Sequence, residues 1–193
     1  MLRYDSTAYL YNTRYEEEQR LKFDAALQDF QSENGSLILD LGCGTGLLFP
    51  RILDRSDEIV GLDISKKMLR RSCPLASSSA KINLVLADAD HPPFRTSCFD
   101  TVFAMTLLQN MPDPHHTLIG IKNLIKPEGR IIITSLDNIN DEQAFLALLH
   151  QTGFDPIRFR AIDNLKCHLA VCHRKPIVHA EKKVAESHSG SAF

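Results

Sequence analysis

The chain has 193 residues, 44% hydrophobic and 24% charged, which are the proportions of an ordinary globular domain with short extensions. A net charge of -2 excludes a basic protein that binds nucleic acid by bulk electrostatics. No apolar run approaches the ~20 residues that cross a bilayer, and the first residues lack the apolar core of a signal peptide. We therefore expect a cytoplasmic protein that neither spans a membrane nor is secreted.

Five cysteines are spread along the chain, an odd number that is not typical of a disulfide framework and that indicates a reducing compartment. The two pairs Cys167-His168 and Cys172-His173 are the one combination that merits testing as a metal site. Residues five apart on a strand point to opposite faces, so the two sulfur atoms cannot share an ion there. We predict half-buried strand residues at these positions and no metal site.

Hydrophobic spacing predicts an alternation of helices and strands. Phe23, Ala26 and Phe30 recur at helical spacing, whereas Leu37-Ile38-Leu39 is a short apolar run typical of a buried strand. The predicted helices cover residues 16–31, 47–53, 66–71, 115–125 and 141–151. Ser65 is the expected N-cap of the third, and a turn over residues 126–129 is expected to close the fourth. The predicted strands cover residues 37–39, 58–63, 83–87, 100–105, 130–134, 157–162 and 166–174.

These elements predict an α/β fold with a Rossmann-like, doubly wound and mostly parallel sheet of seven strands. The last two strands are separated by only a few residues, too few for a parallel crossover, so we expect a C-terminal antiparallel hairpin. We divide the chain into an N-terminal helical segment (residues 1–35), the α/β domain (residues 36–175) and a polar tail (residues 176–193) that we expect to be disordered.

Carboxylates mark the ends of three predicted strands, at Asp40, Asp63 and Asp88. Each alone is also typical of a helix cap or a turn. Ligands of open α/β sheets bind at the carboxyl ends of the strands, so we expect the three to meet in one crevice. Asp63 follows the first loop by about twenty residues, the distance at which a carboxylate meets ribose hydroxyls in nucleotide-binding βαβ units.

The loop after the first strand contains three glycines, Gly42, Gly44 and Gly46. Glycine lets the backbone turn sharply and approach a ligand without side-chain obstruction. We expect the helix that follows this loop to direct its positive N-terminal end toward the same ligand. Together with the acidic strand ends, the loop predicts a nucleotide-type binding site.

Five motifs, in the right order, resemble those of the class I S-adenosylmethionine-dependent methyltransferases, and the chain looks like a small, single-domain member of the type-11 kind. The motifs are Leu39-Asp40-Leu41-Gly42-Cys43-Gly44-Thr45-Gly46, Gly61-Leu62-Asp63-Ile64-Ser65 with Met68-Leu69, Ala87-Asp88-Ala89-Asp90 with Pro93-Phe94, Phe99-Asp100-Thr101-Val102, and Lys126-Pro127-Glu128-Gly129-Arg130. The resemblance covers roughly residues 38–174 and includes the terminal hairpin, which separates this family from dinucleotide dehydrogenases.

The resemblance implies S-adenosyl-L-methionine as the cofactor and a set of residues that would hold it. Asp40 would face the ammonium of its methionine part. Asp63 would accept hydrogen bonds from the ribose hydroxyls, with Ile64 against the adenine ring. Asp88 and the N–H group of Ala89 would bind the adenine edge. The other implied residues, of which the last two would face the sulfonium, are Gly42, Gly44, Gly46, Met68, Met105 and Thr106.

All four tyrosines lie within the first fifteen residues, which also hold Arg14. One interpretation is a helix that packs on the sheet and is aromatic by chance. The other is a lid over the cofactor, in which Tyr11, Arg14 or Tyr15 contacts the methionine carboxylate or the substrate, as the N-terminal segment does in similar enzymes. The planar guanidinium of Arg14 suits a carboxylate, and we expect the lid.

No general base is evident after the fourth strand. The sequence there lacks the Asn/Asp-Pro-Pro-aromatic motif typical of enzymes that methylate planar nitrogens, and related small-molecule enzymes often carry histidines where Gln109 and Asn110 lie. His115 and His116 follow, but we expect them to be exposed at the start of a helix. The catalytic residues and the acceptor, whether metabolite, RNA or protein, therefore remain unassigned.

Two other classes of function are alternatives. A nicotinamide oxidoreductase predicts Gly-x-Gly-x-x-Gly, which differs from the observed glycine spacing. A subunit that binds the cofactor without catalysis, or that needs an activator, is compatible with the missing base. Some small methyltransferases that modify RNA or protein pair with a compact zinc-binding activator along a sheet edge, so such a partner is possible here.

Overall fold

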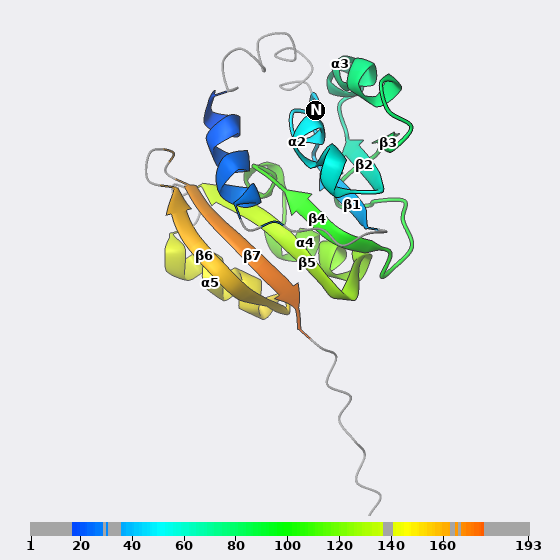
Figure 1. Ribbon diagram of the computed structural model, residues 1–193. Coiled ribbons are helices and arrows are strands. Elements are labelled where there is room, and N and C mark those ends of the chain that lie inside the picture. Colours follow the sequence, from blue (N-terminus) through cyan, green and yellow to red (C-terminus); the bar gives the residue numbers. More distant parts are fainter. Residues whose placement is uncertain are drawn as a thin grey trace, which may run out of the picture.

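The structure is a computed structural model, and it describes residues 17–28, 30, 36–136, 141–162, 165 and 167–175 (Figure 1). The strands are β1 (Leu37–Leu41), β2 (Glu58–Asp63), β3 (Ile82–Leu86), β4 (Phe99–Ala104), β5 (Ile125–Leu136), β6 (Phe154–Ile162) and β7 (Cys167–Arg174). The helices are an N-terminal helix over residues 17–27, α2 (Phe49–Ile52), η1 (Leu53–Arg55), α3 (Lys66–Ser77), η2 (Leu108–Asn110), α4 (Pro114–Leu124) and α5 (Glu142–Gln151).

The strands form one seven-stranded sheet in the order β3-β2-β1-β4-β5-β7-β6. Strands β1 to β5 pair in parallel, and β7 lies antiparallel between β5 and β6. The predicted fold class, including the C-terminal hairpin, is confirmed. The order reverses direction between β1 and β4, which is the point in such sheets where ligands bind.

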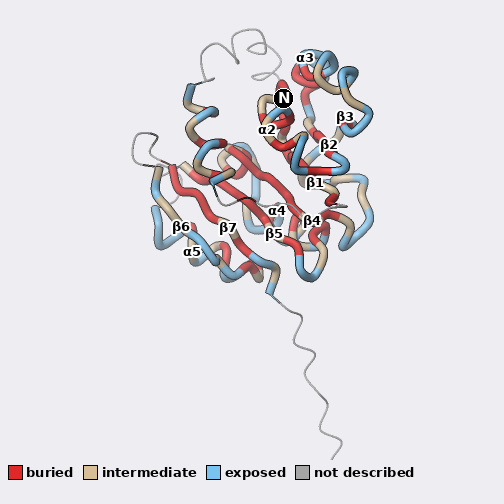
Figure 2. The backbone as a smooth tube through the Cα atoms, in the orientation of Figure 1, coloured by how far each residue is buried: buried red, intermediate tan, exposed pale blue. Residues whose placement is uncertain are grey.

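Two hydrophobic cores, one on each face of the sheet, account for its buried strands (Figure 2). In β1, Leu39 and Leu41 join the core under α4 and α5, whereas Ile38 joins the other. That second core contains Phe23 of the N-terminal helix, Phe49 of α2 and Leu69 of α3. The N-terminal helix therefore packs against the sheet face opposite α4 and α5 (Figure 1).

Side-chain caps set the starts of the three longer helices that follow β2, β4 and β5. The Ser65 hydroxyl accepts from the Met68 N–H group, as predicted, and the Asp141 carboxylate accepts from the Ala144 N–H group. Asp113 does the same at the start of α4. Each cap satisfies a backbone N–H group that has no partner inside its helix.

Some predicted elements have other bounds in the structure, and α3, for example, continues six residues past the predicted end at residue 71. The predicted helix over 47–53 is reduced to the four residues of α2 followed by η1, and it ends where the Ser56 hydroxyl donates to the Ile52 carbonyl. The turn expected at 126–129 lies inside β5, because Ile125 already pairs with Phe99 and a bulge precedes the regular ladder. In the bulge the Lys126 ammonium pairs with Asp100 at 2.8 Å.

Several expectations fall outside the described residues, namely Tyr11, Arg14 and Tyr15 of the expected lid and the expected disordered tail. Of the helix predicted over 16–31, residues 17–27 are helical. The two Cys-His pairs lie on β7, where both cysteines and His168 are buried and His173 is exposed. Across the described ranges, no cluster of side chains suited to a metal ion is present. No helix in those same ranges is long and apolar enough to cross a membrane.

Candidate functional site

The three glycines after β1 adopt a backbone that other residues rarely adopt. Their φ angles are 81° at Gly42, 56° at Gly44 and 78° at Gly46, all in the left-handed region. A Cβ atom at Gly46 would also lie 2.7 Å from the ring of Phe49. The loop therefore depends on glycine both for its dihedral angles and for its contact with α2.

The backbone N–H groups of this loop are already used inside the protein. Gly42 and Cys43 donate to the Leu62 carbonyl at 2.8 and 2.9 Å, and Gly46 donates to the Cys43 carbonyl at 2.9 Å. Gly44 donates to Asp63. A loop that binds pyrophosphate presents free N–H groups to the ligand, whereas the N–H groups of these four residues are occupied inside the protein. Because α2 has only four residues, the expected contribution of a helix dipole is also weak.

Asp63, at the end of β2, connects the glycine loop to the loop that leads into α3. One carboxylate oxygen accepts from the Gly44 N–H group at 2.9 Å, and the other accepts from the Ser65 N–H group at 2.8 Å. Each carboxylate oxygen can accept a further hydrogen bond. Asp63 can therefore hold the loop and still accept bonds from a ligand hydroxyl.

Asp40 lies inside β1, not after it, and its side chain is buried. Burial, reinforced by the negative charge of Asp63, raises the pKa of the Asp40 carboxyl to about 8. No ion pair of Asp40 is found among the described residues. A buried carboxyl group that has no ion-pair partner favours the binding of a ligand that carries a positive charge.

A small hollow that is partly open to solvent lies beside Asp40 at the carboxyl end of β1. It is bounded by the glycine loop, the end of β4 and the N-terminal helix, and its lining residues are Gln19, Phe23, Asp40, Gly42, Cys43, Thr45, Leu47 and Met105. Burial raises the pKa of the Cys43 thiol well above its ordinary value, so this group stays protonated and is a poor nucleophile.

The sequence reasoning missed Gln19 and Phe23, because the lid was expected further toward the N-terminus. Their signal was present, since they lie one helical turn apart on a helix whose apolar face includes Ala26. The aromatic ring of Phe23 belongs to the core shared with Met105. The N-terminal helix is therefore a wall of the hollow.

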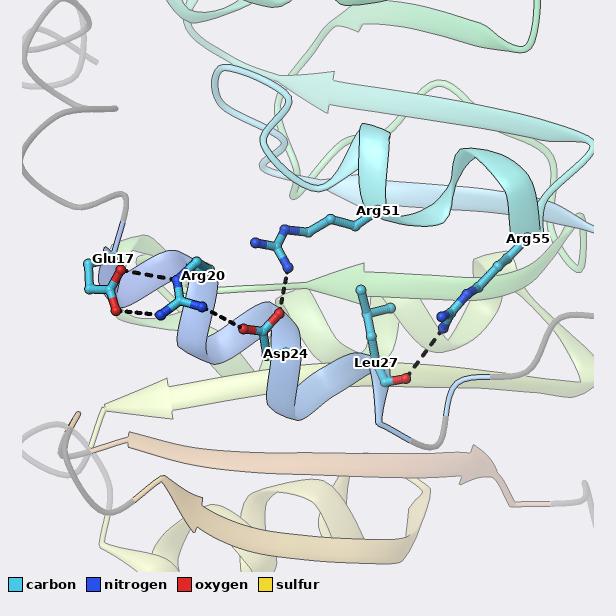
Figure 3. Close-up of polar contacts among 6 residues, drawn as sticks. All are labelled: Glu17, Arg20, Asp24, Leu27, Arg51 and Arg55. Atoms are coloured by element: carbon cyan, nitrogen blue, oxygen red, sulfur yellow. Dashed lines mark hydrogen bonds and ion pairs between the residues drawn. The ribbon is translucent and has the colours of Figure 1, made fainter.

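Polar contacts hold this helix against the segment that follows the glycine loop (Figure 3). The Asp24 carboxylate pairs with Arg51 of α2 at 2.5 Å, and the Arg55 guanidinium donates to the carbonyls of Leu27 and Phe30. Arg20 pairs with Asp24 along the helix at 3.4 Å. These contacts lie on the exposed side, above the buried Phe23 side chain.

The other predicted residues occupy different environments. Ile64 is 39% exposed, which is unusual for a large apolar side chain and leaves a surface for an aromatic ring. Asp88 is exposed, and its carboxylate accepts from the Asp90 N–H group, so it is not drawn into the hollow. Met68 is buried, which leaves no exposed side-chain surface for a ligand. Thr106 has a φ of 58°, which is strained for a β-branched residue.

Together, these features define an α/β domain whose parallel strands end at a hollow lined by the glycine loop and by one of the three predicted carboxylates, Asp40. Residues 39–133 match the Methyltransferase domain family. A ubiquinone biosynthesis O-methyltransferase of Alkalilimnicola ehrlichii is 31% identical over 137 residues, which are 67% of this chain and 53% of that protein. An O-methyltransferase of Aspergillus nomiae is 29% identical over 68% of this chain and 69% of that protein.

Among solved structures, a Haloferax volcanii methyltransferase in complex with the Trm112 methyltransferase activator has the same fold. Its TM-score is 0.79 at 18% identity, and the superposition covers 90% of this chain and 98% of that one. The chain belongs to the class I S-adenosylmethionine-dependent methyltransferases, whose cofactor is S-adenosylmethionine. It spans about half the length of the Alkalilimnicola relative.

Proposed function

We propose that this protein transfers a methyl group from S-adenosylmethionine to an acceptor. The observation that carries the proposal is the pair of carboxylates, Asp40 and Asp63, placed on either side of one glycine loop at the carboxyl ends of β1 and β2. The cofactor carries an ammonium, a ribose diol and an adenine ring, and no phosphate. A loop whose N–H groups are used internally suits that ligand better than a dinucleotide.

The residues present fit the parts of this cofactor. Asp40 faces its ammonium, and Gly42, Gly44 and Gly46 let its methionine part pack on the backbone. The Asp63 carboxylate accepts bonds from the ribose hydroxyls in addition to those from the loop. The exposed Ile64 side chain covers the adenine ring.

The remaining contacts come from the strand ends and the N-terminal segment. Asp88 and Ala89 lie next to the end of β2, because the Ala87 N–H group donates to the Asp63 carbonyl at 3.2 Å. In the proposed complex these two residues bind the adenine edge. Met105 and Thr106 follow β4 and face the sulfonium. Two further contacts to the methionine carboxylate come from Tyr11 and Arg14, and Met68 supports the site from within the protein.

When bound, S-adenosylmethionine supplies an electrophilic methyl group on a sulfonium. The protein's task is then to align the acceptor with that methyl group and to exclude water. The hollow is bounded by the N-terminal helix through Gln19 and Phe23.

Calorimetry separates this proposal from a nicotinamide oxidoreductase. S-adenosylmethionine and S-adenosylhomocysteine should bind, and NAD should not. Asp63→Ala should weaken S-adenosylhomocysteine binding by ~1–3 kcal/mol, the cost of losing hydrogen bonds to a charged group. Asp155→Ala, which removes an exposed carboxylate on the distant strand β6, is the matched control and should bind normally. Tight NAD binding without either sulfur ligand overturns the proposal.

A second candidate is an activator-dependent or non-catalytic subunit, and the edge strand β3 favours a partner. Its last residue, Leu86, is 55% exposed, and Leu84 and Val85 are only half buried. An exposed apolar edge is a surface on which another chain can add a strand. The Haloferax methyltransferase was solved with an activator, which supports an activator as the partner of this chain, and we propose a small zinc-binding one.

A radiolabelled-methyl screen against small molecules, tRNA and cell extract tests for an acceptor directly. Methyl transfer by the chain alone favours an independent enzyme. Retained cofactor binding with no transfer, restored when a zinc-binding activator is added, favours the dependent subunit. We also propose a cytoplasmic location, which is supported by five free cysteines. Bulk nucleic-acid binding is not part of the proposal, given the net charge of -2.

A further inference from the structure

Lys22, on the N-terminal helix, has a fully buried side chain, which is rare for a lysine. Its Nζ atom donates to Glu18 Oε1 at 2.5 Å and to Thr106 Oγ1 at 3.3 Å. Glu18 is 36% exposed, so it lies toward the surface, whereas Thr106 lies at the end of β4. The ammonium is thus buried between a surface carboxylate and the predicted acceptor side of the site.

This lysine is next to the residues that line the hollow. Gln19 and Phe23 flank Lys22 on the same helix, and Met105 immediately precedes Thr106. Lys22 is therefore buried directly behind residues that line the hollow. No part of the proposed cofactor site uses its charge.

Thr106 is held in a strained backbone by several bonds. Its N–H group donates to Thr134 Oγ1 at 2.7 Å, and its carbonyl accepts from the side-chain amides of Gln109 at 2.8 Å and Asn110 at 3.0 Å. A β-branched residue at a φ of 58° persists only where the surroundings determine it, and such strain clusters at functional sites. Because Thr106 Oγ1 accepts from Lys22, its own hydrogen can be donated to a ligand.

Gln109 gives an independent sign of a ligand at this point. Its Oε1 atom is buried and accepts no hydrogen bond in the part of the chain that the structure describes. Buried polar atoms nearly always have a partner, so an orphaned one marks a place that a ligand or water fills. The same side chain is fixed to the Thr106 carbonyl through its Nε2 atom.

We propose that Lys22 and Thr106 bind the acceptor as an oxyanion, with the Lys22 ammonium and the Thr106 hydroxyl both donating to the oxygen that receives the methyl group. The acceptor is thus a small molecule with an acidic oxygen, either an acidic hydroxyl such as a phenol or a carboxylic acid. The Gln109 Oε1 atom accepts from a second polar group of the same molecule. This inference rests on the proposed methyl transfer and names its substrate class.

The chemistry accounts for the missing general base. The acceptor loses its proton to solvent on binding, because a buried ammonium favours the ionised oxygen. The oxyanion then forms a bond to the methyl carbon as the carbon–sulfur bond breaks, and the electron pair of that bond stays on the sulfur, which becomes a neutral thioether. An oxygen that is already ionised needs no base at the moment of transfer.

Anchoring the helix does not require a buried ammonium. The Asp24–Arg51 pair and the bonds from Arg55 already hold the helix from outside, and Phe23 holds it from inside. An apolar side chain of similar length would fill the same space without the cost of removing a charge from water. The charge therefore indicates a role in binding.

The test uses the full chain with bound S-adenosylhomocysteine and two probes, 4-nitrophenol for the hydroxyl class and benzoate for the carboxylate class. 4-Nitrophenol is titrated about one pH unit below its own pKa, where its phenolate band reports ionisation on the protein. Benzoate binding is followed by calorimetry. We expect one probe to bind, and which one binds identifies the acceptor class.

Lys22→Met should lower the affinity for whichever probe binds by at least about tenfold, which is equivalent to the loss of one charge-assisted hydrogen bond. Lys22→Arg should retain binding, and S-adenosylhomocysteine affinity should be unchanged in both variants. Thr106→Val removes only the hydroxyl and should also lower the affinity for the probe. This second variant keeps the test valid if Lys22→Met does not fold. Binding of neither probe overturns the inference, as does equal binding in all three variants. Failure to bind S-adenosylhomocysteine would instead defeat the proposed function.

Discussion

Replacing Asp40 by Asn should change how the stability of the protein depends on pH. The pKa of Asp40 is raised from 3.8 to about 8 by burial and by the charge of Asp63. Between these two values the folded protein binds the proton more tightly than the unfolded chain does. The contribution of protonated Asp40 to the free energy of unfolding is therefore complete below pH ~4 and is lost as the pH rises through about 8.

The size of the effect follows from the gap between the two pKa values. At 1.36 kcal/mol for each tenfold change in proton affinity, the wild-type protein should lose on the order of 5 kcal/mol of unfolding free energy across this window. Asn has the same shape and no charge to bury. The variant should therefore match the wild type near pH 4 and be more stable by several kcal/mol near pH 9.

Urea unfolding at a series of pH values, followed by circular dichroism, measures this difference. All other titrating groups are common to both proteins, so subtracting one profile from the other isolates Asp40. Parallel profiles would refute the reasoning, because they would mean that Asp40 titrates alike in the folded and unfolded chains. The same variant should bind S-adenosylhomocysteine ~10–100-fold more weakly, because an ammonium that faces the amide gains no charge pair.

Four further predictions concern the stability of the domain, and three of them concern the glycine loop and the helices beside the hollow. Gly46→Ala should lower the unfolding free energy by ~1–3 kcal/mol, because it combines a φ of 78° with a Cβ atom 2.7 Å from the Phe49 ring. Gly120→Ala, within α4 where nothing lies within 4 Å of the new Cβ atom, should instead stabilise the protein by ~0.5–1 kcal/mol in the same denaturant assay, and a loss there would contradict the space seen around it. Phe49→Ala should cost ~3–5 kcal/mol, since this ring is fully buried, and a loss below ~1 kcal/mol would mean that it does not fill the core. Asp24→Ala should change global stability by less than ~1 kcal/mol while accelerating amide hydrogen exchange in residues 17–28, and unchanged exchange would show that the pair with Arg51 does not anchor the helix.

Most of the fold followed from the sequence because its signals are local. Isoleucine and leucine runs marked the buried strands, Ser65 marked a helix start, and a short gap marked the final hairpin. The bulge at the start of β5 was not foreseen, since the Lys126–Asp100 pair that accompanies it joins residues on different strands. Local sequence carries no record of such pairing.

The candidate site was predictable where it depends on glycine and on strand ends, and unpredictable where it depends on the N-terminal helix. The positive φ angles of the loop glycines agree with the predicted turn. That Asp63 holds the loop amides could not be read from spacing, because the bond to Gly44 spans the gap between two strands. Lys22 also escaped notice, since a lysine on an amphipathic helix is ordinarily solvated.

The N-terminal helix is fastened to the rest of the domain in two physically different ways. Its exposed contacts include ion pairs such as Asp24–Arg51, and these weaken as ionic strength rises. Its buried contact is the apolar packing of Phe23, which added salt leaves intact or strengthens. Raising the salt concentration should therefore loosen the exposed contacts of the helix while its buried contact with the sheet persists.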